Sequence, residues 1–167
     1  MLKINSSKLQ KGNALSLSKG FTLIELLVVI GILAILLAIT LIAINPARQF
    51  GNANDTKRRS DITQILNSIG QYTAENSGNL PAEVSALVAD TPTNLDDTAF
   101  PNLCTELVTD YLPALPVDPD LNDQDGIEAA DCAVAGWNTD YEIARDANDR
   151  ITVSAPNAYS GPIEVTR

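Results

Sequence analysis

A run of apolar residues over positions 21–44 is the first feature in the hydrophobic pattern of the chain. Only Thr22, Glu25 and Thr40 place polar side chains in it. As a helix, the run would be about 36 Å long, which is enough to cross a bilayer with some tilt. A helix that is apolar on every face does not suit the core of so small a protein. The run therefore predicts a transmembrane helix.

The next segment has apolar residues at helical spacing. They follow i, i+3, i+4, i+7 and i+10 and predict an amphipathic helix: Ile62, Ile65, Leu66, Ile69 and Tyr72. The polar positions off this stripe are Asp61, Gln64, Gln71 and Glu75. Pro46 and the weak helix formers at 51–54 predict a kink or a weak stretch rather than a helix end. Since Gly78 and Pro81 should end the helix, it would run over about 21–76, near 85 Å if continuous.

Residues 81–127 contain six prolines and predict irregular structure, with short helices at 83–89 and 102–111. Alternating patterns predict strands at 137–145 and 150–155, joined by a turn at 146–149, and a third strand at 163–166. The expected fold class is α+β: a long N-terminal helix, membrane-spanning in its first half and amphipathic in its second, packed on a small antiparallel sheet head.

The charge is unevenly distributed along a chain whose formal net charge is −10. The only charged residues among the first twenty are Lys3, Lys8, Lys11 and Lys19. No Lys or Arg occurs between Arg59 and Arg145, where many carboxylates lie. Because phosphate contacts need Lys and Arg, we expect no direct binding of nucleic acid by the acidic head. The surface suits cations or basic partners, or serves only to keep an exposed protein soluble.

Histidine is absent, so the commonest general base and zinc ligand is missing. Cys104 and Cys132 are too few for a thiolate metal site and too far apart for a redox Cys-x-x-Cys pair. In an oxidising compartment they would form a disulfide, and free buried thiols are the alternative. Acidic pairs such as Asp96 and Asp97 lie in polar loop sequence and do not suggest acid–base work. We expect no enzyme activity.

The apolar run is too long for an ordinary secretory signal, and Asn45-Pro46-Ala47 is a poor cleavage site. An uncleaved anchor is the alternative. Basic residues flank the run on both sides, so they do not fix its orientation. The expected disulfide and the acidic C-terminal part favour export of that part. Glu25 lies inside the run with no Lys or Arg to neutralise it, and such residues are usually paired and functional.

Residues 19–30 read KGFTLIELLVVI. They resemble, over about a dozen residues, the prepilin cleavage and methylation motif of type IV pilins and type II secretion pseudopilins. The resemblance implies that a membrane-bound prepilin peptidase cuts after Gly20 and methylates the new amine of Phe21. Glu25 matches the glutamate of that family. We expect its carboxylate to pair with the Phe21 amine of a neighbouring subunit and to fix the axial register, since an unpaired charge in a dry helix bundle is costly.

The resemblance also implies an organisation and a set of partners. Residues 1–20 would be the leader, 21–44 the transmembrane half of the helix, 45–77 its amphipathic half and 78–167 the head. The precursor would lie in the lipid bilayer of the inner membrane with its head outside the cytoplasm. Inner-membrane assembly machinery would then build it, with copies of itself, into a helical filament at the cell surface or in the periplasm.

A second, looser resemblance lies at Leu115-Pro116-Val117-Asp118-Pro119, which is similar to the Leu-Pro-x-Asp-Pro segment of major pseudopilins. Those proteins bind calcium beside it, although the aromatic residue and glycine that usually follow are missing here. Clustered oxygen ligands on a bending loop suit calcium, and the alternative is a plain acidic turn. The EF-hand spacing fails. The candidate ligands are Asp118, Asp120, Asn122, Asp123 and Asp125.

Two filament functions stay open. One is a surface type IV pilin for adhesion, motility or DNA uptake, which the disulfide slightly favours. The alternative is a pseudopilin that drives protein export through a type II secretion system, which the Leu-Pro-x-Asp-Pro segment favours. Lys57, Arg58 and Arg59 are expected to face solvent in one subunit. In a filament they would meet the acidic head of a neighbour, or they form only a solvated helix face.

Overall fold

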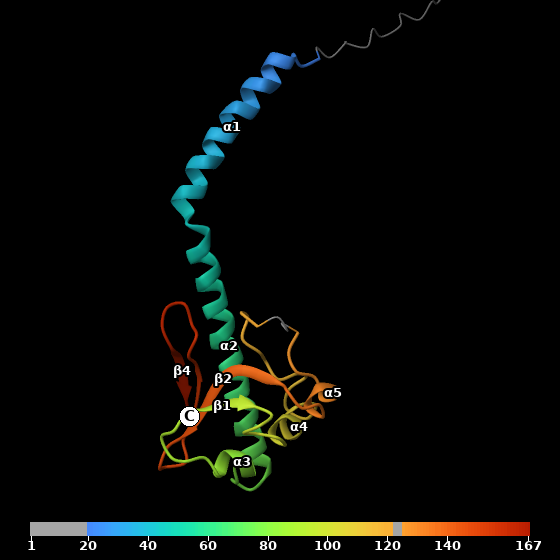
Figure 1. Cartoon of the computed structure of the whole chain (residues 1–167), viewed down its shortest axis with the longest axis vertical. Helices are drawn as coiled ribbons and strands as arrows, with labels where there is room; N and C mark the ends of the chain where they lie inside the picture. The colour runs from blue at the N-terminus through green and yellow to red at the C-terminus, as the bar shows by residue number, and fades with distance from the viewer. Residues whose placement is uncertain (1–19, 122–124) are drawn as a thin grey trace, which may run out of the picture. The chain divides into compact units, whose positions relative to one another are not determined.

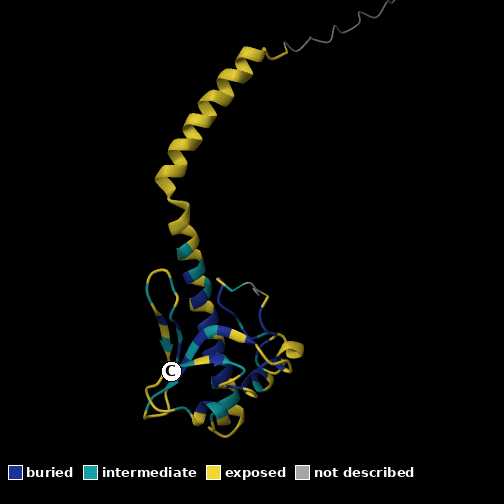
Figure 2. Ribbon diagram, in the orientation of Figure 1, coloured by how far each residue is buried: buried dark blue, intermediate teal, exposed yellow. Residues whose placement is uncertain are grey.

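The computed structural model describes residues 20–121 and 125–167, and the chain divides into two units at Ile44. In the first unit, helix α1 (Leu23–Ile44) has no buried residue, so its apolar side chains are exposed all around it (Figure 2). By length and composition α1 is able to cross a membrane, and it is the one such helix in the described ranges. This is the helix that the apolar run predicts.

Helix α2 (Pro46–Glu75) begins the second unit. Asn45 separates it from α1 with a left-handed backbone, φ 48°, and caps α2 by accepting a hydrogen bond at Oδ1 from the Arg48 amide at 3.4 Å. The expected kink inside one helix is therefore a break between two helices. Pro46 causes it, because proline has no N–H and disfavours the α conformation in the residue before it.

Four antiparallel strands form one sheet in the order β1-β2-β3-β4 (Figure 1): β1 (Thr93–Asp96), β2 (Asn138–Arg145), β3 (Ile151–Ala155) and β4 (Ile163–Thr166). The last three confirm the predicted strands to within a residue or two. Strand β1 was not predicted, because it lies in the proline-containing stretch for which irregular structure was expected; its register also shifts between Asn94 and Asp96. The mixed α+β fold that the sequence predicts is confirmed.

The amphipathic part of α2 packs against β3 and β4. Ile62, Ile65, Leu66 and Ile69 are all buried, as the apolar stripe predicts, and Tyr72 packs against them. Asp61 was placed off this stripe, but it is buried as well.

Short helices between α2 and β2 complete the core of the second unit. They are α3 (Ala82–Ser85), α4 (Leu103–Leu107) and α5 (Ala129–Cys132). The first two occupy the predicted places but are shorter than predicted, and α5 was not predicted. Cys104 and Cys132 form the expected disulfide, which joins α4 to α5. Because both sulfurs come from buried residues, the disulfide lies within the core rather than on the surface.

Candidate processing and assembly site

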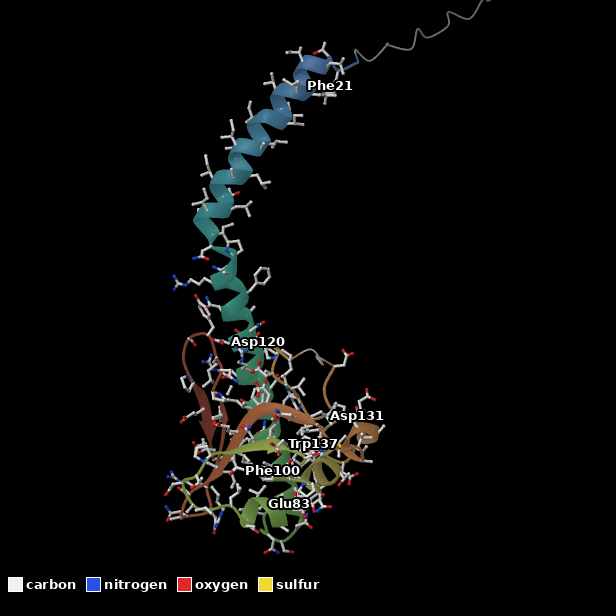
Figure 3. All side chains as sticks on the ribbon, in the orientation of Figure 1. Phe21, Glu83, Phe100, Asp120, Asp131 and Trp137 are labelled. Carbon is white, nitrogen blue, oxygen red and sulfur yellow. A yellow bond between two sulfur atoms is a disulfide. The ribbon has the colours of Figure 1, made fainter. Side chains whose placement is uncertain are left out.

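The expected cleavage point lies just before α1. Gly20 and Phe21 are exposed and outside any helix, and Phe21 has 82% of its surface accessible (Figure 3). A peptidase needs an extended backbone that no neighbouring side chain covers. Gly20 has no side chain, and a Cβ built on it would meet no atom within 4 Å. Gly20 and Phe21 are therefore not covered by any other described part of the chain.

Thr22 and Glu25 form a reciprocal cap on the first turn of α1. The Thr22 amide and hydroxyl donate to Glu25 Oε2 at 3.0 and 2.9 Å, and the Glu25 amide donates to Thr22 Oγ1 at 3.3 Å. This is a capping box, which satisfies amide groups that no helical carbonyl can reach. The signal for it is present in the sequence as Thr-x-x-Glu, from which this cap could have been predicted.

The cap gives the Glu25 carboxylate a defined position. Its Oε2 accepts both bonds from Thr22, whereas Oε1 takes part in no hydrogen bond among the described residues. A carboxylate held in this way presents one oxygen outward from the first turn of the helix. The arrangement can receive a cation from another molecule without losing the contact that begins the helix.

A second polar cluster lies in the second unit, around Arg58. This side chain is 1% exposed and donates to both oxygens of Asp118 at 2.7 Å, to Asp120 Oδ2 at 2.6 Å and to Asp55 Oδ1 at 3.1 Å. Figure 3 shows Asp120 beside α2. We call Arg58, Asp55, Asp118 and Asp120 the Arg58 network. Its hydrogen bonds, first those to Asp118, raise the pKa of Arg58 and keep the guanidinium charged.

Asp55 extends the network to a third segment. Its carboxylate accepts from the backbone amides of Tyr159 and Ser160 at 2.8 and 2.9 Å. Burial by itself would raise the pKa of Asp55, but the hydrogen bonds from Ser160, Tyr159 and Arg58 outweigh it and lower the pKa to about 2. The network thus connects α2 with the segment at 118–120 and with the loop before β4.

The network corrects two expectations from the sequence. Arg58 was expected to face solvent with Lys57 and Arg59, yet it is buried, because Asp118 and Asp55 compensate its charge. Asp118 was expected as a calcium ligand, yet it is buried and both of its oxygens accept from Arg58. The Arg58 guanidinium already compensates the charge of Asp118, so this carboxylate is engaged in an internal ion pair.

The other expected calcium ligands do not form a site in the described ranges. Asp120 binds Arg58 and the Asn54 amide, and Asp125 is exposed. Asn122 and Asp123 lie outside the described residues. No group of three acidic, cysteine or histidine side chains that could hold a metal occurs in the part of the chain that the structure describes. Residues 118–120 instead form part of the contact between this segment and α2.

A second hydrogen-bonded group lies next to the Arg58 network and joins α2 to strand β2 and to Val117. Asp61 Oδ2 accepts from the Tyr141 hydroxyl on β2 at 2.8 Å and from Lys57 Nζ at 2.8 Å. Lys57 also donates to the Val117 carbonyl at 2.8 Å. Burial first, and the Asp61 contact second, raise the pKa of Tyr141, so its hydroxyl keeps its proton. This group has a structural role, because every member already has a partner inside the chain.

A comparison with protein families identifies the N-terminal segment. The prokaryotic N-terminal methylation motif matches residues 15–41, which include Gly20, Phe21, Glu25 and most of α1. No curated protein and no solved structure matched the chain. The chain carries the signature of type IV pilins and pseudopilins, a structural rather than an enzymatic class, and the fold agrees with that signature.

Proposed function

From this pilin and pseudopilin signature, we propose that the chain is a filament subunit. Prepilin peptidase cuts it after Gly20 and methylates the amine of Phe21, and the mature subunit is assembled through α1. The observation that supports this best is the helix itself: α1 is apolar on every side and none of its residues is buried. Such a helix needs to be surrounded by lipid or by other helices. In a filament subunit that is stored in the membrane, lipid surrounds the helix first and neighbouring helices surround it after assembly.

Glu25 has a specific place in this function. Cleavage creates a cationic amine on Phe21, four residues before Glu25. In a bundle of α1 helices, this amine pairs with Glu25 Oε1 of a neighbouring subunit, while Oε2 stays in its bonds with Thr22. The pairing supports assembly because an unpaired charge in a dry bundle is costly, so a misplaced subunit is disfavoured.

A surface pilus is the destination that we propose. The Cys104–Cys132 disulfide joins α4 to α5, and such a crosslink suits a fibre outside the cell. The second candidate is a type II secretion pseudopilin. It is favoured by the segment at 115–119, whose Asp118 is held against α2 by Arg58.

The experiment is mass spectrometry of the N-terminal peptide from two fractions, sheared surface material and membranes. A methylated Phe21 terminus that is abundant in the sheared fraction supports the pilus. The same terminus in membranes alone supports the pseudopilin. An intact leader in both fractions would refute the proposed processing.

Glu25→Gln tests the pairing in the same cells. The amide keeps the size of the side chain and its ability to accept the bonds from Thr22, but it cannot neutralise an amine. We expect normal membrane insertion and filament recovery at least tenfold lower, a factor that corresponds to about 1.4 kcal/mol. Thr40→Ala is the matched control, because Thr40 bonds only to the Leu37 carbonyl within its own helix. Filaments from Glu25→Gln at wild-type yield would refute the pairing.

A further inference from the structure

Two aromatic side chains are exposed at the end of the second unit where α2 begins. Phe50 on α2 has 72% of its surface accessible, and Tyr159, in the loop between β3 and β4, has 58%. The other large apolar residues exposed in the described part of this unit are Val88 and Val134. A single exposed apolar residue needs no explanation, but the contacts of Tyr159 hold it in its exposed position.

The loop at 156–162 fixes Tyr159 against the first turns of α2. The backbone amides of Tyr159 and Ser160 donate to the Asp55 carboxylate at 2.8 and 2.9 Å. The ring lies over Gly51, where a Cβ would be only 2.5 Å from Cγ of Tyr159. The absence of a side chain at Gly51 therefore lets the ring rest on the helix backbone, on the surface of the unit rather than in its core.

The side chains around the start of α2 extend to different sides of the helix. Successive helical residues are about 100° apart, so the Tyr159 ring over Gly51 lies more than a quarter of a turn from Phe50. Arg48 is exposed, makes no hydrogen bond or ion pair within the described residues, and lies about 200° from Phe50. A folded partner covers one side of a helix, whereas lipid surrounds it. The arrangement favours lipid as the partner.

The charge at this end of the unit also suits a membrane. Residues 45–54 and 156–162 contain one charged residue, Arg48, in a chain with 21 acids. The acids beside them already have partners: Asp55 is buried in the Arg58 network, and Asp120 binds Arg58 and Asn54. Lipid contact here would leave no carboxylate without a partner, and the cation is free to meet a phosphate.

The chain itself keeps Phe50 close to the membrane-crossing segment. Only Asn45 separates α1 from α2, and the candidate span ends at Ile44. The Cα atom of Phe50 is therefore no more than about 13 Å from that of Ile44. The headgroup region on each side of the hydrocarbon core is about 5–7 Å thick. Tyrosine is enriched there, because its ring is apolar and its hydroxyl is polar.

We propose that Phe50 and Tyr159 lie in the headgroup region of the membrane that α1 crosses, and that Arg48 pairs with a phospholipid phosphate there. The proposal rests on the membrane-stored stage of the proposed function. It adds a second lipid contact to that of α1 and assigns it to the start of the second unit. This contact holds that end of the unit at the membrane surface until the subunit is assembled.

Quenching of tryptophan by brominated lipid tests the contact. The full-length chain is reconstituted at low density into phosphatidylcholine vesicles brominated near the headgroup end of the acyl chains. Phe50→Trp and Tyr159→Trp are the reporters, and the wild type, with its buried Trp137, gives the baseline. Val88→Trp is the matched control, since Val88 is also 72% exposed but follows α3, at the other end of α2 (Figure 1).

We expect quenching of both reporters to be at least about twofold stronger than that of Val88→Trp. Quenching of Phe50→Trp without Tyr159→Trp would overturn the proposal, because Phe50 is tethered to α1 by the chain alone. Quenching of both reporters that disappears when the protein is diluted further in lipid would also overturn it, since a second subunit would then be what covers the surface.

Leu37→Trp, within α1, separates this proposal from the proposed function. Strong quenching of Leu37→Trp by lipid brominated at the middle of the acyl chains, with neither reporter quenched above Val88→Trp, overturns the headgroup contact and leaves the membrane stage intact. If Leu37→Trp is not quenched either, α1 is not in the bilayer, and both the contact and the membrane-stored stage are overturned.

Discussion

Arg58 is the residue whose removal should destabilise the second unit most clearly. Its guanidinium is 1% exposed and holds Asp118, which is fully buried, together with Asp55 and Asp120. In Arg58→Ala, the Asp118 carboxylate keeps one contact, the bond from the Asp120 amide at 2.9 Å. Its charge would then lie in the interior without a compensating cation.

The cost follows from the burial of that charge. Breaking a buried ion pair by removing one partner costs about 3–5 kcal/mol. Domains have total stabilities of about 5–15 kcal/mol, so the change would remove about a fifth of the stability or more. Asp120 adds little, because it is exposed and its attraction to Arg58 is screened by solvent.

The assay is urea unfolding of the full-length chain in detergent, followed by fluorescence of Trp137, which is buried in the second unit. Arg59→Ala is the control, since it removes the same side chain from the next position, where it is exposed and has no described partner. We expect the control to lie within about 0.5 kcal/mol of the wild type. Equal losses in the two variants would refute the argument that burial of the Arg58 network determines the cost.

Three further outcomes follow from individual contacts. The pKa of Asp55 is lowered from 3.8 to about 2. Its ionised carboxylate therefore stabilises the fold above pH 3.8 by about 2 kcal/mol, and this contribution is lost as the pH falls toward 2. Acid unfolding curves of Asp55→Asn should lack this pH-dependent loss of stability. Reduction of the Cys104–Cys132 disulfide, which spans 28 residues, should lower the free energy of unfolding by on the order of 3 kcal/mol, and urea curves with and without reductant would measure this. A Cβ on Gly51 would lie 2.5 Å from Cγ of Tyr159, so Gly51→Ala should displace that ring and change the near-ultraviolet circular dichroism, whereas Gly70→Ala, with no atom closer than 3.8 Å, should not.

The sequence predicts those parts of the structure that depend on periodic apolar residues. The all-apolar run gives α1, the spacing from Ile62 to Ile69 gives the buried side of α2, and alternation gives three of the four strands. Each of these elements is defined by local sequence and by one apolar face. Strand β1 lies in the proline-containing stretch that predicts irregular structure, and helix α5 has four residues and no apolar stripe.

The Arg58 network could not be predicted in the same way. A row of three basic residues is normally solvated, and its pattern does not say which member is turned inward. Arg58 is buried because Asp118, sixty positions further along, folds back onto α2. Only the Asp55–Arg58 contact is local enough to be read from the sequence. The capping box at Thr22 is local too, and the Thr-x-x-Glu spacing would have predicted it.

The position of the polar contacts along α2 explains why a small head buries so many charges. The apolar stripe of α2 begins only at Ile62, whereas Asp55, Arg58 and Asp61 lie in the two turns before it, where no large apolar residue is buried. In these turns, α2 is joined to the rest of the unit by ion pairs and hydrogen bonds. Ion pairs of this kind add little net stability compared with apolar contacts, but each requires one specific partner. The contacts therefore fix the rotation of α2 against the sheet, and this rotation leaves Arg59 on the exposed side and Arg58 inside.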